Sequence, residues 1–251
     1  EQQTVCTVDN ANNRVTYGAG GSLSGAFYRP LGPGPFPAVL VLHTRGGFNA
    51  HVQSAAALLA PQGFVTLAPD YFTPLGVTRE TYDLSTFFVR HTDEAKDVIA
   101  QALECLKSLS FVDRNRIGAV GYSLGGYFGF VLATRDDVKG VVSYYGAYHG
   151  SPVSLVPTKY SFSDIVLQTR APVLMLHGDQ DTTRPVIVAY GVRTLLTLGG
   201  KTSQLIVYPG VEHSFDALGS STFDAAATLD AQAKTLDFLR APPGNRLEAL
   251  R

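Results

Sequence analysis

A single serine lies in a glycine-rich turn near the middle of this 251-residue chain. The turn reads Gly-Tyr-Ser-Leu-Gly-Gly over residues 121–126, after the apolar run 117–120 and before the apolar run 127–133. A strand that passes at once into a helix needs a tight turn, and small residues on either side of Ser123 avoid a backbone clash there. The pattern therefore predicts a serine whose hydroxyl projects from a strand-to-helix turn.

Such a hydroxyl is a weak nucleophile near neutral pH unless a histidine accepts its proton and a carboxylate orients that histidine. Two later apolar runs, 172–176 and 204–208, each end in a loop with groups of this kind. The first loop holds Asp179 and Asp181, and the second holds His213. Loops at the carboxyl ends of parallel strands gather at one edge of a sheet, so these groups can meet the serine.

This set of motifs resembles the dienelactone hydrolase family of α/β-hydrolases over about residues 20–240. The serine turn, the acid loop with an aspartate four residues before Pro185, and the segment 208–215 match that family's pattern in order and spacing. The resemblance implies an α/β-hydrolase fold with a mostly parallel central sheet and helices on both faces.

The resemblance also assigns the catalytic roles. It implies Ser123 as the nucleophile, Asp181 as the acid and His213 as the base. Asp179 stays the alternative acid, and its other possible role is to cap the turn that contains Asp181.

Three positions depart from that family's pattern. Its founding members have a cysteine where this chain has Ser123, a glutamate where it has Thr44, and an arginine where it has Ala217. A switch that depends on the glutamate and a clamp for a substrate carboxylate are therefore not expected. We expect small, neutral esters or lactones as substrates rather than dienelactone itself.

Two backbone N–H groups are expected to form an oxyanion hole for the oxygen that gains charge during attack on an ester. One belongs to Leu124, directly after the serine, and the other to Arg45, in the loop after the apolar run 38–42. As an alternative, the side chain of Arg45 contacts a polar substrate.

The residues expected to line the substrate site are mainly aromatic. Tyr144, Tyr145 and Tyr148 follow the expected strand 138–143 at the same sheet edge, and one of them, with Tyr145 favoured, lines the site unless these rings only cap the core. The aromatic excursion 70–90 either forms a pocket wall or only packs over the sheet. The predicted substrate-binding residues are Thr44, Phe72, Tyr122, Tyr145 and Phe215.

The remaining histidines show no metal-binding pattern. We expect His43 to be a hydrogen-bonding residue near the serine and His177 to stabilise the acid loop. His51, His91 and His149 form neither an i, i+4 pair nor an H-x-H motif. We therefore expect no metal and no cofactor.

Composition favours one globular domain over residues 1–251, with a leader at about 1–20 and a tail at 241–251 peripheral to it. The chain is 45% hydrophobic and 16% charged, as in globular proteins. Its net charge of −1 indicates no excess of positive charge that would attract nucleic acid or an anionic membrane. No apolar stretch approaches the ~20 residues that span a bilayer. Within the domain we expect strands at 22–28 and 36–42 and a helix that opens with Thr92 as its N-cap.

The two cysteines leave two interpretations open. Cys105 lies on a helical apolar stripe, which fits a buried core thiol, whereas pairing with Cys6 would tie the amino-terminal segment to the domain in an oxidising compartment. The chain starts at Glu1 and shows no signal-like segment, which favours a secreted or periplasmic mature form. The oligomeric state is not predicted.

Three functions are compatible with the motifs. The leading one is a carboxylesterase-type serine hydrolase that acts on a small-molecule ester through an acyl-enzyme. A peptidase or amidase uses the same triad but usually needs an extra domain or a charged clamp. A non-catalytic binding member of the fold usually lacks a triad residue, and none is missing here.

Overall fold

The computed structural model describes residues 4–149 and 158–241. It divides into two compact units, Glu1–Gly118 and Ala119–Arg251. The prediction of one domain stays a prediction. The predicted peripheral tail lies, apart from Ala241, outside the described residues. No helix in the described ranges is long and apolar enough to cross a membrane.

The first unit is built on a mixed sheet with the strand order β1-β2-β3-β5-β4. Its strands are β1 (Thr4–Asp9), β2 (Arg14–Ala19), β3 (Leu23–Tyr28), β4 (Phe36–Leu42) and β5 (Val65–Pro69). The pairings along β1, β2, β3 and β5 are antiparallel, whereas β4 and β5 are parallel. The predicted strands at 22–28 and 36–42 are confirmed as β3 and β4.

Helices α1 and α3 both pack on this sheet. The helical segments of the unit are α1 (Ala50–Leu59), the 3₁₀ turns Ala60–Gln62 and Thr73–Leu75, α2 (Leu84–Thr86), the π-helical turn Phe87–His91 and α3 (Thr92–Ser108). Strand β6 (Val112–Tyr122) begins in this unit and ends in the second.

The predicted peripheral leader is wrong for residues 4–19, because they form the hairpin β1–β2. Along β2, Val15 and Tyr17 are buried and alternate with exposed residues, as in a strand with one face on a core. The leader is thus part of the sheet.

The predicted N-cap at Thr92 is also wrong, because the chain is already helical before that residue. Asp83 caps the segment, and its carboxylate accepts a 2.8 Å hydrogen bond from the backbone N–H of Thr86. Thr92 lies inside the continuous helical run, where its hydroxyl donates to the Phe88 carbonyl four residues earlier.

A cluster of aromatic rings surrounds His43, directly after β4. The imidazole stacks on Tyr71 at 3.6 Å between ring centroids, and Phe72 lies at 4.8 Å. Its Nδ1 donates to the Thr44 carbonyl oxygen, and burial lowers the pKa of His43 to about 4. His43 is therefore a neutral hydrogen-bonding residue, and its predicted place near the serine stays a prediction.

The aromatic excursion at 70–90 packs in this unit. Its four buried rings belong to Tyr71, Phe72, Phe87 and Phe88, and Tyr82 stacks on Phe72 at 5.7 Å. Of the two alternatives left open by the sequence, these contacts support packing.

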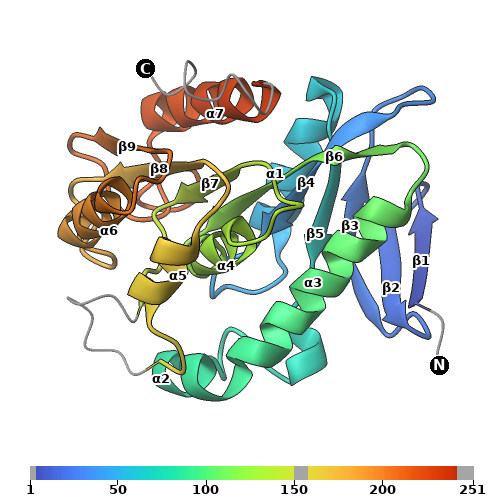
Figure 1. The fold of residues 1–251 in the computed structure, drawn as a ribbon, viewed down its shortest axis with the longest axis horizontal. Coiled ribbons are helices and arrows are strands. Elements are labelled where there is room, and N and C mark those ends of the chain that lie inside the picture. Colours follow the sequence, from blue (N-terminus) through green and yellow to red (C-terminus); the bar gives the residue numbers. More distant parts are fainter. Residues whose placement is uncertain (1–3, 150–157, 242–251) are drawn as a thin grey trace. The chain divides into compact units, whose positions relative to one another are not determined.

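The second unit has a fully parallel sheet in the order β6-β7-β8-β9. Its other elements are α4 (Leu124–Ala133), β7 (Val141–Tyr144), α5 (Phe162–Gln168), β8 (Val173–Gly178), α6 (Val186–Leu198), β9 (Ser203–Tyr208) and α7 (Ala225–Arg240). Every residue of β7 and β8 is buried, which is typical of parallel strands covered on both faces. Figure 1 shows α7 on one side of β7–β9 and α4–α6 on the other.

The parallel order brings the loops after β6, β7, β8 and β9 to one edge of the second unit's sheet. The register pairs Tyr122 with Tyr144, and Tyr144 with Leu176, so these strands end side by side. The segments predicted to carry the serine, the acid and the base therefore start from neighbouring strand ends.

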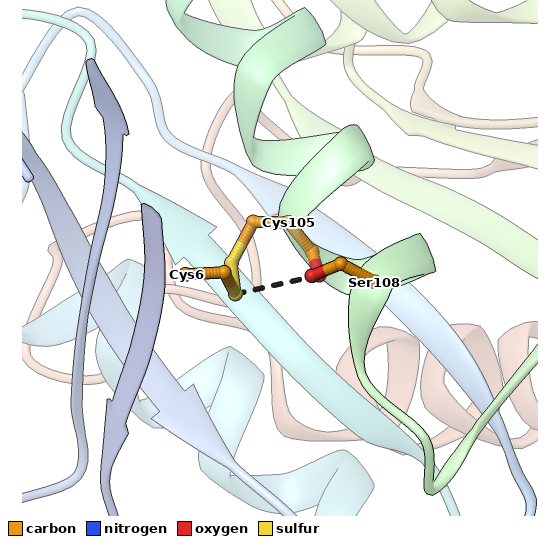
Figure 2. Close-up of a disulfide and its surroundings, with 3 residues drawn as sticks. All are labelled: Cys6, Cys105 and Ser108. Atoms are coloured by element: carbon orange, nitrogen blue, oxygen red, sulfur yellow. Dashed lines mark hydrogen bonds between the residues drawn. A yellow bond between two sulfur atoms is a disulfide. The ribbon is translucent and has the colours of Figure 1, made fainter. Parts of the chain in front are cut away.

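A disulfide joins Cys6 in β1 to Cys105 in α3 (Figure 2). Cys105 is buried on the apolar stripe of α3, but it is bridged. The interpretation as a core thiol is therefore wrong, and the alternative of a bridge is confirmed. The Cys105 carbonyl oxygen accepts a 2.7 Å hydrogen bond from the Ser108 hydroxyl. The bridge ties the first strand to the helix across 99 positions of sequence.

Replacing both cysteines, Cys6→Ala with Cys105→Ala, should lower the free energy of unfolding by about 2–5 kcal/mol, because a long loop is no longer closed in the unfolded chain. Denaturant unfolding with and without a reductant measures the effect. The reduced wild type should match the double variant, which itself should not respond to the reductant. Equal unfolding midpoints for the variant and the oxidised wild type would contradict the stabilising role.

Candidate active site

Ser123 forms the single-residue connection between β6 and α4. Its backbone, with φ 50° and ψ −108°, adopts a conformation that non-glycine residues seldom take. A Cβ on Gly121 would lie 2.1 Å from the Gly125 carbonyl oxygen, so this turn requires glycine. The predicted strand-to-helix turn is confirmed.

The backbone of Ser123 is held from both sides. Its N–H donates to the Tyr144 carbonyl at the end of β7, at 3.0 Å. Its carbonyl accepts from the N–H groups of Gly126, at 2.9 Å, and Ala147, at 2.8 Å. These bonds compensate for the unfavourable backbone conformation and fix the position of the hydroxyl.

His213 lies between Ser123 and Asp181. Its Nε2 is 3.2 Å from the Ser123 hydroxyl oxygen, and its Nδ1 is 2.7 Å from Asp181 Oδ2. An ionised carboxylate only accepts hydrogen bonds, so Nδ1 carries the hydrogen and Nε2 presents a lone pair to the serine hydroxyl. The structure thus brings together the three residues that the sequence predicted as a triad.

The carboxylate of Asp181 is fully buried and is held by its own loop. The Arg184 N–H donates to Asp181 Oδ1 at 2.6 Å. His177 approaches from the other side, with its Nε2 3.4 Å from Asp181 Oδ2 and 2.6 Å from the Arg184 carbonyl oxygen. Because a carbonyl only accepts, His177 donates from Nε2.

His177 remains uncharged beside this acid. Burial is the main cause of its lowered pKa and outweighs the attraction of Asp181. The pair is therefore a contact between a carboxylate and a neutral imidazole rather than a salt bridge. His177 holds the loop turn in place, as predicted, through its hydrogen bond to the Arg184 carbonyl oxygen.

Asp179 makes a different contact. Its Oδ1 accepts a 2.7 Å hydrogen bond from the Gly210 N–H, in the loop after β9. Next to it, the Gln180 N–H donates to the Val211 carbonyl at 2.9 Å. Asp179 therefore connects the acid loop to the base loop, whereas Asp181 contacts the histidine.

Two predicted substrate-binding residues depart from expectation. Tyr145 and Phe215 have no exposed surface, and their rings lie 5.6 Å apart in an edge-to-face contact. Tyr145 also lies against the His213 ring, at 4.6 Å between centroids. Both rings support the base loop from within the protein instead of presenting surface to a ligand.

Tyr122, a third predicted substrate-binding residue, is also largely buried. Its ring packs on that of Tyr144 at 4.8 Å between centroids.

Leu124, the first residue of α4, directly follows the serine. The first N–H groups of a helix have no partner within it, so such a position is suited to bind an oxyanion. Thr44, Arg45 and Phe72 belong to the first unit, where the Thr44 hydroxyl accepts from the Gly46 N–H at 2.9 Å. The predicted roles of these four residues toward a substrate stay predictions.

Some contacts of the site could not be read from the motifs. The N–H of Arg184 reaches Asp181 within an aspartate turn, which the sequence signals only as a polar loop before proline. Asp216 accepts a hydrogen bond from the Tyr145 hydroxyl, 71 residues away, and no sequence signal predicts that pairing. Across residues 4–149 and 158–241, no group of three or more His, Cys, Asp or Glu side chains is arranged to hold a metal ion.

Comparison with known proteins identifies one family. The model of the dienelactone hydrolase family matches residues 23–242. A protein assigned as a carboxymethylenebutenolidase in Methylorubrum extorquens is 26% identical over 217 residues, covering 84% of this chain and 74% of that protein.

Solved structures share the fold. A dienelactone hydrolase assigned in Klebsiella pneumoniae has a TM-score of 0.75 and 25% identity, covering 88% of this chain and 93% of the other. A dienelactone hydrolase-like promiscuous phosphotriesterase from metagenomic libraries has a TM-score of 0.74 and 20% identity, covering 94% and 96% of the two chains. The α/β-hydrolase fold predicted from the sequence is confirmed.

The contact between His213 and Asp181 should give a proton NMR signal for His213 Nδ1–H far downfield of the amide region, because the acceptor is a buried charge. Asp181→Asn should move that signal upfield or abolish it. Asp179→Asn, which keeps an acceptor oxygen for Gly210, should leave it in place. The reverse pattern would make Asp179 the acid.

Proposed function

Because the chain belongs to the dienelactone hydrolase family, we propose that it cleaves small carboxylic esters or lactones with Ser123 as the nucleophile. Family membership makes it a carboxylesterase-type hydrolase. The observation that carries the proposal is the position of His213, whose two ring nitrogens reach the Ser123 hydroxyl and the buried Asp181 carboxylate.

The geometry supports general-base activation of the serine. As the Ser123 oxygen bonds to the ester carbonyl carbon, His213 Nε2 takes the hydroxyl proton and the carbonyl electrons move onto oxygen. Asp181 stabilises the resulting imidazolium through Nδ1–H. When the tetrahedral intermediate collapses, the carbon–oxygen bond to the alcohol breaks and Nε2 gives the proton to the leaving oxygen.

Water completes the cycle. His213 Nε2 takes a proton from the water molecule that attacks the acyl-enzyme, and returns it to the Ser123 oxygen as the acid is released. In both acylation and deacylation, the tetrahedral intermediate needs hydrogen-bond donors at its oxyanion. We propose the backbone N–H of Leu124 as one of them, contributing about 3 kcal/mol. The second donor, predicted from Arg45, stays a prediction.

We propose neutral substrates because of the charges near the base. Thr44 and Ala217 stand where the family resemblance places a glutamate and an arginine. On the base loop itself, Glu212 is exposed and Asp216 is partly exposed, so two carboxylates flank His213 in sequence. This loop therefore offers no cation to pair with a carboxylate on the substrate.

The cysteine pair supports a proposal about location. Disulfides persist in oxidising compartments and are rare in the cytosol, so the bridge from Cys6 to Cys105 favours a secreted or periplasmic protein. Alkylation and mass spectrometry of the protein from its own cells would overturn this proposal if both thiols reacted.

Hydrolysis of a short p-nitrophenyl ester should fall by about 10⁶-fold in Ser123→Ala, because the nucleophile is lost. A phosphonate inhibitor should label Ser123 in the wild type, while the exposed Ser221 serves as an unlabelled control serine. Asp181→Asn should cost about 10⁴-fold in turnover and Asp179→Asn far less. Unchanged hydrolysis in Ser123→Ala would contradict the proposed function.

A short neutral ester should have a higher kcat/KM than a dienelactone carboxylate by about ten- to a hundred-fold, since a missing charge-assisted contact weakens recognition by about 1.5–3 kcal/mol. Steady-state kinetics on the two substrates measures this margin. Arg45→Ala and Arg184→Ala test the cations that could supply the contact. If the anionic lactone is preferred, and either variant abolishes that preference, the neutral-ester proposal is wrong.

A further inference from the structure

Tyr145, next to the triad, has a constrained backbone. It directly follows β7, its φ is 36°, and its backbone N–H donates to the Leu176 carbonyl of β8 at 2.8 Å. A non-glycine residue keeps a positive φ only where its surroundings hold it there, and such residues cluster at functional sites. The backbone of Tyr145 is thus fixed to the ends of two neighbouring strands.

The side chain of Tyr145 connects these strand ends to the base loop. Its ring lies 4.6 Å from the His213 ring, with 60° between the ring planes. Its hydroxyl donates to Asp216 Oδ1 at 2.5 Å, three residues beyond His213. One side chain therefore contacts both the imidazole and the loop that carries it.

The donor and acceptor in this bond have fixed roles. Burial and the negative charge of Asp216 hold the pKa of Tyr145 well above its usual range. The phenol therefore stays protonated, and the carboxylate of Asp216 is the acceptor.

The rest of the base loop does not fix the imidazole on its own. The Phe215 carbonyl accepts from the N–H of Asp224 and from the Thr228 hydroxyl, which anchors the loop backbone. Between Phe215 and the base, Ser214 has a positive φ of 58°, so the chain turns sharply there. Asp181 holds the ring at Nδ1 only, and a single hydrogen bond leaves the ring free to tilt about it.

We propose that Tyr145 and Asp216 form a positioning pair that holds His213 with Nε2 aimed at the Ser123 hydroxyl. The proposal rests on the proposed function. It assigns Tyr145 to the support of the base, in place of the substrate contact expected from sequence. The Nε2–Oγ distance of 3.2 Å lies at the long end of a useful hydrogen bond, so a small tilt of the ring breaks it.

The test removes the bond without removing the ring. Tyr145→Phe should lower kcat by about ten- to a hundred-fold and leave KM within about two-fold, because a displaced base slows the chemical step more than binding. Asp216→Ala should have the same effect, and the two changes together should cost no more than either one alone. Asp216→Asn keeps an acceptor oxygen and should restore most of the rate.

A second tyrosine–aspartate pair in the same unit provides the matched control. The Tyr208 hydroxyl donates to Asp230 Oδ2 at 2.9 Å, and its ring lies 5.4 Å from that of Phe215. Tyr208→Phe should change kcat by less than about two-fold. If it lowers kcat as much as Tyr145→Phe does, the effect reflects general packing and the positioning role is wrong.

The His213 Nδ1–H signal separates this proposal from the proposed function, because it requires no catalysis. It should shift or broaden in Tyr145→Phe and Asp216→Ala but not in Tyr208→Phe. If the proposed function is wrong, Ser123→Ala will hydrolyse the ester as fast as the wild type, whatever the NMR result. A Tyr145→Phe enzyme with the wild-type signal and kcat would overturn the positioning pair. If that variant does not fold, Asp216→Ala and Asp216→Asn decide the question by the same two readouts.

Discussion

The buried carboxylate of Asp181 is the group on which the site depends. A charge without solvent contact is costly unless hydrogen-bond donors surround it. The N–H of Arg184 and Nδ1–H of His213 supply these donors, and they fix both the turn of the acid loop and the tautomer of the base. His177 adds a contact without adding a charge, because burial lowers its pKa. The electrostatic stabilisation from Asp181 is thus directed to the one imidazole that faces the serine.

The serine turn could be predicted because its cause is local. Gly121 and Gly125 are four residues apart, and the clash that excludes larger side chains lies between them. The choice between Asp179 and Asp181 rested on family resemblance alone, since both lie in the same short loop. In the structure, the Gly210 N–H donates a hydrogen bond to Asp179 from a distant part of the chain. This contact leaves Asp181 as the aspartate that binds the histidine. The contact between Tyr145 and Asp216 was missed for the same reason, because the two residues are 71 positions apart.

The fold was predicted best where apolar runs are long and least at its amino-terminal edge. Half of residues 4–19 are polar and no long apolar run occurs among them, so the hairpin they form was taken for a leader, although Val15 and Tyr17 already alternate as in a strand. Without that strand, Cys6 had no defined place beside Cys105, and both interpretations of the cysteines stayed open. The helical start before Thr92 was hidden because a π-helical turn interrupts the regular period.

The bonds between the acid loop and the base loop have a consequence for how this enzyme is made. The ribosome releases the chain from its amino end, so Ser123 and Asp181 emerge well before Gly210 and Val211. Until those later residues arrive, Asp179 and Gln180 lack the partners that hold the acid loop to β9, and the serine lacks its base. A partly synthesised chain thus carries an unactivated hydroxyl. In the proposed mechanism, the reaction begins only once β9 has joined the sheet and the loop that follows it has placed His213 beside Ser123.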